Sequence, residues 1–232
     1  MAKNTLVQSE ISGYISNLLR AHFGKGPTAV YVTIEHSFIS IHFRGFLAAM
    51  EKNMMDQNEL RKVLVTRNLI IRNLEPEIMD KIEELTGSRI QEFYTDWNFE
   101  KETGLIIGVI DGEFEKQPSA EPDSVNEQAL RNYIDRASGI TQKTPARTDL
   151  YWLDNRTLLV RRSEILLEIE KEFIRSGFLE ELKFSRKQLE NRAFQEAEPE
   201  TVLEGSIEEM FLFWNFEKDQ GYTVFRLGKK KE

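Results

Sequence analysis

The chain has 232 residues, with 31 basic and 39 acidic side chains, a net charge of −8 and no cysteine. The absence of thiols excludes disulfides, thiolate catalysis and cysteine metal sites. Residues 1–116 carry 13 basic and 17 acidic side chains and residues 117–232 carry 18 and 22, so each half has a charge of −4. Neither half offers the basic surface that binds a phosphate backbone, and we therefore expect no nucleic-acid partner.

The first predicted element is an amphipathic helix that begins at a capping box formed by Thr5 and Gln8. It ends before Gly24, because glycine suits the left-handed conformation that follows a helix. Alternating apolar residues then predict two short strands, 30–34 and 39–43, joined by a tight turn.

Two helices and a second pair of strands complete this first unit. Apolar spacing predicts a short helix around 46–55 and a long helix from about 57 to 86. Pro76 lies inside the long helix and should kink or split it, because proline removes a backbone donor. Strands at 90–99 and 105–110 then form a hairpin.

The second half of the chain repeats the first. The segment 97–104 returns as 214–221, 117 residues later, with six of eight residues identical. Other short matches follow in the same order: Tyr14-Ile15 with Tyr133-Ile134, Lys25-Gly26-Pro27 with Lys143-Thr144-Pro145, and Glu75-Pro76-Glu77 with Glu198-Pro199-Glu200.

The second unit should contain the same elements with some losses. Ser124 and Glu127 form a second capping box at the start of its first helix. Strands at 150–153 and 158–162 follow, and the helical region after them is interrupted at Gly177.

The order in each unit is αββααββ, which predicts an α+β fold of antiparallel sheets with helices packed on one face. We place the first unit at 1–115, a polar linker with two prolines at 116–123, and the second unit at 124–232. We expect the units to be related by a pseudo-twofold axis. A protein with a single copy of the unit would bury its contact surface by pairing with a second chain. In this chain the two units can bury that surface against each other, so we expect a monomer.

The first unit resembles a known bacterial family. The resemblance rests on the run 21–28, on the hairpin after it, on an acidic helix that ends in 83–87, and on the strand that carries Asp96. These features are similar to the DUF2294 or MpsC-domain family, named after a sodium-translocating, membrane-potential-generating system, over about residues 6–112. The resemblance implies a soluble bacterial protein associated with an ion or inorganic-carbon transport system. It implies no catalytic residues.

The loop around Lys25 is the first candidate binding site. Gly24 and Gly26 free backbone N–H groups and Lys25 adds a positive charge, so the loop could hold an anion. The alternatives are a helix C-cap followed by an entry into a strand set by Pro27, or a lysine that caps the carbonyls of the preceding helix. In the second unit both glycines are replaced.

Residues 90–99 present a second candidate. Alternation places Trp97 on an apolar face, and Tyr94 and Asp96 on the opposite face, where they could line a small polar pocket with Ser40 and His42. In the second unit this opposite face carries Phe211 and Phe213. Exposed phenylalanines would form a costly patch, so we expect both to be covered by the sister unit, a helix or a second chain.

The repeated segment 97–104 is typical of a hairpin. We expect Gly104 and Gly221 to supply the positive φ of the turn, and Asn98 and Asn215 to bind the loop backbone. The alternative is that the tip of this hairpin has a role in binding, because both units retain its sequence.

No Gly-x-Ser-x-Gly or Gly-x-Gly-x-x-Gly motif occurs, and the three histidines have no metal-ligand spacing. We therefore predict no catalytic, cofactor or metal residues. No stretch approaches the roughly 18 apolar residues of a membrane span, and residues 1–5 do not open a signal peptide, so we expect a cytoplasmic protein.

We expect a non-enzymatic binding or adaptor protein whose protein partner belongs to a membrane transport complex. One alternative is a sensor of a small molecule or an anion, with a pocket near Lys25 or Asp96. The other is an enzyme of unknown type, which would require titratable groups that converge in a deep cleft.

Overall fold

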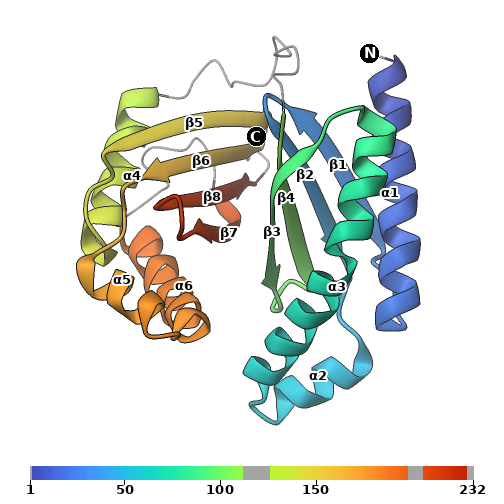
Figure 1. Cartoon of the computed structure of the whole chain (residues 1–232), viewed down its shortest axis with the longest axis horizontal. Helices are drawn as coiled ribbons and strands as arrows, with labels where there is room; N and C mark the ends of the chain where they lie inside the picture. The colour runs from blue at the N-terminus through green and yellow to red at the C-terminus, as the bar shows by residue number, and fades with distance from the viewer. Residues whose placement is uncertain (1, 112–125, 198–205, 229–232) are drawn as a thin grey trace. The chain divides into compact units, whose positions relative to one another are not determined.

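The computed structural model describes residues 2–111, 126–197 and 206–228. The chain divides into two compact units, Met1–Gln117 and Pro118–Glu232, and each is described by itself (Figure 1). The first unit contains α1 (Ala2–Phe23), β1 (Ala29–Glu35), β2 (Phe38–Arg44), α2 (Ala49–Asp56), α3 (Leu60–Thr86), β3 (Ile90–Asn98) and β4 (Thr103–Ile110).

The second unit repeats this order element by element. It contains α4 (Glu127–Thr141), β5 (Arg147–Asp154), β6 (Thr157–Ser163), α5 (Glu168–Arg175), α6 (Leu179–Glu196), β7 (Ile207–Asn215) and β8 (Gln220–Leu227). The αββααββ order and the α+β class expected from the sequence are confirmed.

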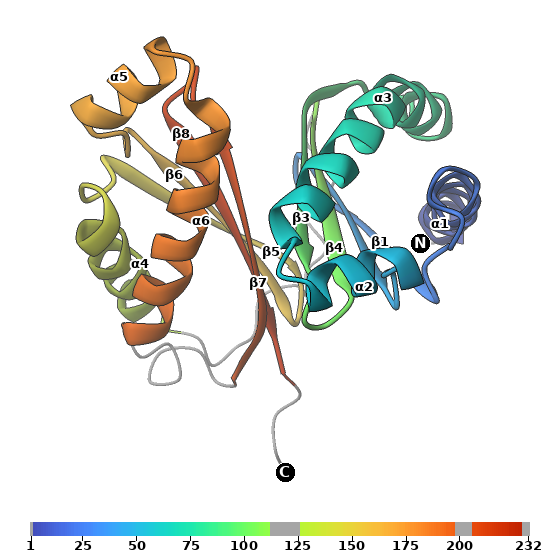
Figure 2. The same ribbon diagram turned by 90° about the horizontal axis from the view of Figure 1, so that it is seen from below.

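Each unit has one four-stranded antiparallel sheet. The strand orders are β1-β2-β4-β3 and β5-β6-β8-β7, so the second hairpin of each unit joins the first through its later strand. Figure 2 shows α1 and α3 on one face of the first sheet, and α4 and α6 on one face of the second. The inward-pointing side chains of these strands and helices form the core of each unit.

The first helix of each unit begins differently from the prediction. Thr5 and Gln8 lie inside α1, which already begins at Ala2, so they do not form a capping box. In the second unit Asn126 is the N-cap of α4, and its Oδ1 accepts the backbone N–H of Ala129 at 3.0 Å. Ser124 lies outside the described residues.

The long helix α3 runs unbroken through Pro76, so the helix does not split as one alternative predicted. Pro76 is exposed, while Leu74, Ile78 and Ile82 on the other face are almost completely buried against the sheet. Packing of this apolar face outweighs the loss of one backbone hydrogen bond. The helix ends at Gly87, whose φ of 73° is the expected left-handed cap.

A tyrosine ties the first helix to the long helix in both units. In the first unit the hydroxyl of Tyr14 donates to Glu77 at 2.7 Å. In the second unit Tyr133 donates to the carbonyl of Phe194 at 2.8 Å. This tether explains why the Tyr-Ile pair recurs, since the isoleucine that follows each tyrosine is fully buried.

Candidate functional site

A buried ion pair joins α2 to α3 in the first unit. Arg67 donates from Nε to Glu51 Oε1 at 2.7 Å and from Nη2 to Glu51 Oε2 at 2.6 Å. Arg67 is 1% exposed and Glu51 is 8% exposed. Glu51 also accepts the backbone N–H of Ala48, so the same carboxylate caps α2 and fixes it to α3.

Aromatic rings enclose the guanidinium of Arg67. Its Cζ lies 4.5 Å from the ring centroid of Trp97, 4.7 Å from that of Phe46 and 5.3 Å from that of Phe99. Trp97 and Phe99 come from the repeated segment 97–104. Their recurrence in both units therefore has a structural cause, because they cover a buried arginine by cation–π contact.

Residues 45–48, here called the bridging segment, connect these parts. The carbonyl of Phe46 accepts from Arg67 at 2.8 Å, and the N–H of Phe46 donates to the carbonyl of Glu102 at 2.9 Å. The ammonium of Lys25 donates to the carbonyl of Leu47 at 2.9 Å. The lysine loop, the tip of the second hairpin and the Glu–Arg pair thus meet at one end of the sheet.

These contacts locate the first set of predicted binding residues. Lys25 is exposed and ties its loop to the bridging segment, rather than to carbonyls of the preceding helix. Gly24 has the left-handed φ of 71° expected of a helix cap. Gly26 packs closely, because a Cβ there would lie 3.2 Å from the carbonyl oxygen of Ser16. Anion binding by this loop stays a prediction.

The second unit contains an equivalent ion pair. Glu170 and Arg186 occupy the positions of Glu51 and Arg67, each 119 residues later, and Arg186 Nη1 lies 3.3 Å from Glu170 Oε1. Arg186 also faces the rings of Trp214 and Phe216, at 5.7 and 5.8 Å from their centroids.

Two further charges are buried beside this pair in the second unit. Arg162 stands where the first unit has Phe43, and Glu190 stands where it has Ile71; both charged side chains are 0% exposed. Arg162 Nη2 donates to Glu190 Oε2 at 2.6 Å. Two arginines and two glutamates therefore form a neutral buried quartet.

Glu190 is the centre of this quartet. Its Oε1 accepts from Arg186 Nε at 2.9 Å, from Trp214 Nε1 at 2.8 Å and from the side chain of Gln142. Burial alone would raise the pKa of Glu190, but the charges and hydrogen bonds of Arg162 and Arg186 outweigh it and hold this pKa below its ordinary value. Glu190 is thus an anion in the interior.

The hairpin glycines have a different role from the one predicted. Positive φ values occur at Glu102 and Asp219, with 52° and 51°, whereas Gly104 and Gly221 lie inside strands. A Cβ on Gly104 would lie 2.3 Å from Phe43 Cε2, so glycine is required by close packing and not by the turn. The other expectation is confirmed, because Asn98 and Asn215 each accept a loop N–H, at 3.2 and 3.0 Å.

The second set of predicted binding residues lies on the sheet face opposite the helices. His42 and Asp96 are 1% and 5% exposed, and Tyr94 is half-buried. The register places Leu105 between Asp96 and His42, on the strand that separates theirs. Asp96 accepts the N–H of Trp97 at 2.8 Å, and the hydroxyl of Tyr94 donates to Glu92.

Phe211 and Phe213 occupy the corresponding face of the second sheet. Both are buried, at 0% and 3% exposure. Their role as an interface stays a prediction.

Sequence reasoning missed the Glu–Arg pairs and the surface that they support. Each pair holds a short helix against the beginning of a long one, and these form the first helix pair (α2 and α3) and the second helix pair (α5 and α6). In Figure 1 α2 and the beginning of α3 extend past one end of the first sheet. A repeat search at a spacing of 119 residues could have found Glu51 with Glu170 and Arg67 with Arg186.

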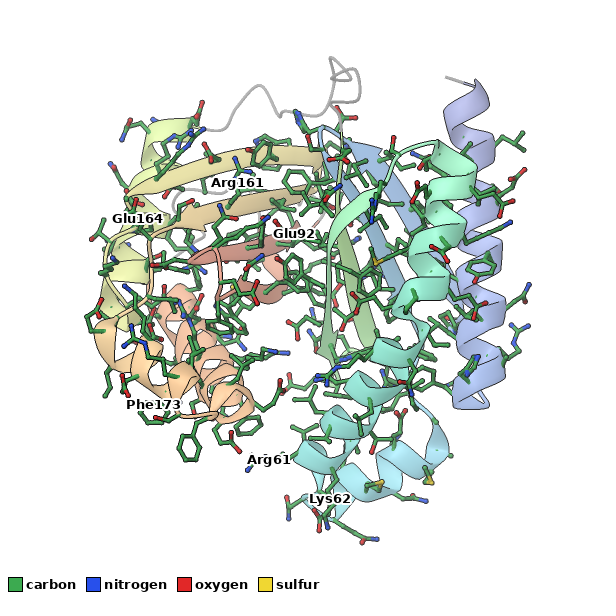
Figure 3. All side chains as sticks on the ribbon, in the orientation of Figure 1. Arg61, Lys62, Glu92, Arg161, Glu164 and Phe173 are labelled. Atoms are coloured by element: carbon green, nitrogen blue, oxygen red, sulfur yellow. The ribbon has the colours of Figure 1, made fainter. Side chains whose placement is uncertain are left out.

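Both helix pairs display apolar side chains to solvent. Met50 on α2 is 68% exposed, and its counterpart Ile169 on α5 is 61% exposed. Phe173 follows Ile169 by one turn, is 44% exposed, and contacts Phe178 edge to face with ring centroids 6.1 Å apart. Figure 3 shows Phe173 pointing outward from α5. Both units thus expose an apolar side chain at the same position of the short helix.

The charges of these pairs are almost completely buried and bind one another, so they hold the helices together. Within the described ranges, no three His, Asp or Glu side chains gather as a metal site would require. Of the helices that the structure describes, none is both long and apolar enough to cross a membrane.

Fold and site together define a tandem α+β protein in which a buried Glu–Arg pair anchors an exposed helix pair in each unit. Residues 3–112 match the family model described as Na+-translocating membrane potential-generating system (MpsC). The match confirms the resemblance for the first unit and does not extend to the second. No curated protein and no solved structure matches the chain.

Proposed function

We propose that the chain is a non-enzymatic binding or adaptor protein, accessory to a bacterial membrane ion-transport system, that recognises its partner through its helix pairs. The observation that carries this proposal is the exposure of Met50 and Ile169 at equivalent positions of α2 and α5. In the second unit Ile169 is joined by the exposed Phe173 and Phe178, and such a group of apolar side chains is suited to contact with a partner.

The anchoring of the helix pairs supports this function. The short helices have eight residues each, and a helix of that length is not stable alone in water. Glu51 and Glu170 cap these helices and bind the buried arginines of the neighbouring long helices. A surface that is rigid before binding loses less conformational entropy when the partner docks.

The family match supports the membrane setting. The family model carries the name of a Na+-translocating membrane potential-generating system, and it covers the first unit. Protein interfaces have a small apolar core and a polar rim that stays in contact with water. A few exposed apolar side chains among polar ones match this arrangement, so the partner we propose is a protein.

The test is an affinity capture from detergent-solubilised membranes of the host, with the tagged chain and two variants. The first variant carries Ile169→Ser and Phe173→Ser, which remove apolar contact area from α5. The second carries Leu6→Ser, which removes one exposed apolar side chain outside the helix pairs, on α1, where Leu6 is 61% exposed.

We expect the wild type and the Leu6→Ser variant to retain the same membrane transport subunit, and the α5 variant to lose it. Equal capture by all three proteins, or capture of no membrane protein, would contradict the proposal. Circular dichroism spectra establish that each variant is folded.

A further inference from the structure

The first turns of the two long helices, α3 and α6, carry opposite charges. The first turn of α3 contains Arg61 and Lys62, whereas the first turn of α6 contains Glu180 and Glu181 at the equivalent positions, 119 residues later. All four side chains belong to exposed residues. Figure 3 shows Arg61 and Lys62 projecting from the beginning of α3.

The basic side chains lie at the helix end where positive charge is unfavourable. The N-terminus of a helix carries a partial positive charge, so acidic residues such as Glu180 and Glu181 stabilise it and basic residues destabilise it. Lys62 is compensated by its ion pair with Glu59 at 2.7 Å, whereas the charge of Arg61 is unfavourable at this end of the helix. Because an exposed ion pair adds little to stability, a basic first turn is better explained by binding than by folding.

Each charged pair lies beside exposed apolar side chains of its own helix pair. In the first helix pair these include Met50 and Leu60, and in the second helix pair Ile169, Phe173 and Phe178. The first turn of α3 is thus basic and the first turn of α6 is acidic, each beside apolar side chains. Within its own chain Glu180 also pairs with Lys183 at 3.0 Å.

We propose that the first helix pair of one chain binds the second helix pair of another copy of the same chain. This inference rests on the proposed function, since it names one partner of the same surfaces. The pairing places Arg61 and Lys62 of one copy against Glu180 and Glu181 of the other, with the apolar side chains between the copies. Because the two surfaces differ, the contact is heterologous, and it can close into a dimer or extend into longer chains.

The contact is reversible and depends on salt. The charges are exposed, so ions screen their attraction at physiological ionic strength. The chain is then a monomer when dilute, as expected from the fused pair, and associates as its concentration rises. This association uses a surface other than the one that contains Phe211 and Phe213.

Charge reversal tests the pairing directly. The basic-to-acidic variant carries Arg61→Glu and Lys62→Glu, and the acidic-to-basic variant carries Glu180→Lys and Glu181→Lys. In each variant alone both surfaces have the same sign, whereas in an equimolar mixture each surface finds its opposite on the other protein. Sedimentation-velocity experiments measure association from low micromolar to near-millimolar concentration.

We expect each reversal to raise the dissociation constant of self-association at least about tenfold, and the mixture to regain the wild-type value. The matched control carries Asp80→Lys and Glu83→Lys, two exposed acids near the end of α3, and should associate like the wild type. Thermal unfolding establishes that all proteins are folded.

Three outcomes would overturn the inference: a wild type that stays monomeric at every concentration, single variants that associate normally, or a mixture that does not recover. The captured membrane protein reports separately on the proposed function. If the α5 variant loses that protein while the mixture fails to associate, only the contact between copies is wrong.

Discussion

Arg186 occupies in the second unit the place that Arg67 occupies in the first, but it is shared between two carboxylates. Arg67 binds Glu51 through two parallel hydrogen bonds, whereas Arg186 directs Nε to Glu190 and Nη1 toward Glu170. The first unit therefore concentrates the strength of its anchor in one pair, and the second distributes it over four side chains.

The first prediction concerns the pair in the first unit. Glu51→Gln leaves the guanidinium of Arg67 buried without a counter-charge, which should lower the stability of α2 and α3 by about 3 to 5 kcal/mol. Hydrogen exchange measured on peptides from these helices gives the free energy of opening. As a control, Glu59→Gln removes the exposed pair with Lys62 and should cost less than about 1 kcal/mol. Equal losses in both variants would mean that the buried pair is not an anchor.

The second prediction is a pH dependence that belongs to the second unit. Because the pKa of Glu190 is lower in the folded state than its ordinary value, this carboxylate stabilises the unit at neutral pH, and the stabilisation is lost as the pH falls through the folded pKa. The pKa of Asp149 is lowered as well, since hydrogen bonds from Arg147 and Arg161 outweigh its burial, and it acts in the same direction.

Urea unfolding from neutral pH into the acid range compares the wild type with the Glu190→Gln variant. The variant should be less stable at neutral pH by about 3 to 5 kcal/mol, because two buried arginines lose a counter-charge, and its stability should fall less steeply with pH. A variant that loses stability with acid as steeply as the wild type would contradict the assignment.

The third prediction separates two roles of glycine. Gly104→Ala should destabilise the first unit by about 1 to 3 kcal/mol, because its new Cβ would overlap Phe43 and Trp97. Gly13 lies inside α1, and a Cβ added there would have nothing within 4 Å, so Gly13→Ala should stabilise the unit by about 0.5 to 1 kcal/mol. Thermal unfolding measures both, and opposite signs are expected. If Gly104→Ala were neutral, close packing would not explain this glycine.

The fourth prediction concerns Lys25. Removing its ammonium by Lys25→Ala loses the hydrogen bond to Leu47 and should cost about 1 kcal/mol, with or without phosphate in the buffer. Lys143→Ala, at an exposed equivalent position, is the matched control and should be neutral. Thermal unfolding at several phosphate concentrations checks this. Stabilisation by phosphate that disappears in Lys25→Ala would instead favour the anion-binding loop.

Local patterns in the sequence predict much of the fold. Alternation identifies the strands around Ile41 and Trp97, and helical spacing identifies α3, because a two-residue or a 3.6-residue period follows directly from which side chains are buried. The beginning of α1 could not be predicted in this way. Thr5 and Gln8 satisfy the rule for a cap, but the helix continues past them, and a side-chain motif alone does not stop a helix.

The site was harder to predict than the fold. A buried arginine such as Arg67 appears in a sequence as one more surface charge of an amphipathic helix, and its partner Glu51 is 16 residues away. The exposed Ile169 and Phe173 appear as core residues for the opposite reason, since hydropathy does not say which face is covered. Only the repeat at a spacing of 119 residues singles out these positions. It aligns the charged residues Glu51 and Arg67 with Glu170 and Arg186, and the apolar residue Met50 with Ile169.

The buried quartet also limits how the two units can have diverged. Where the first unit has Phe43 and Ile71, the second has Arg162 and Glu190, on β6 and α6. Either charge alone would be uncompensated in the interior, so Arg162 and Glu190 depend on each other. Replacing one of them by the apolar residue of the first unit should therefore be more costly than replacing both. A chimera that exchanges β2 for β6 without also exchanging α3 for α6 should therefore fail to fold, although every piece comes from a stable unit of the same chain.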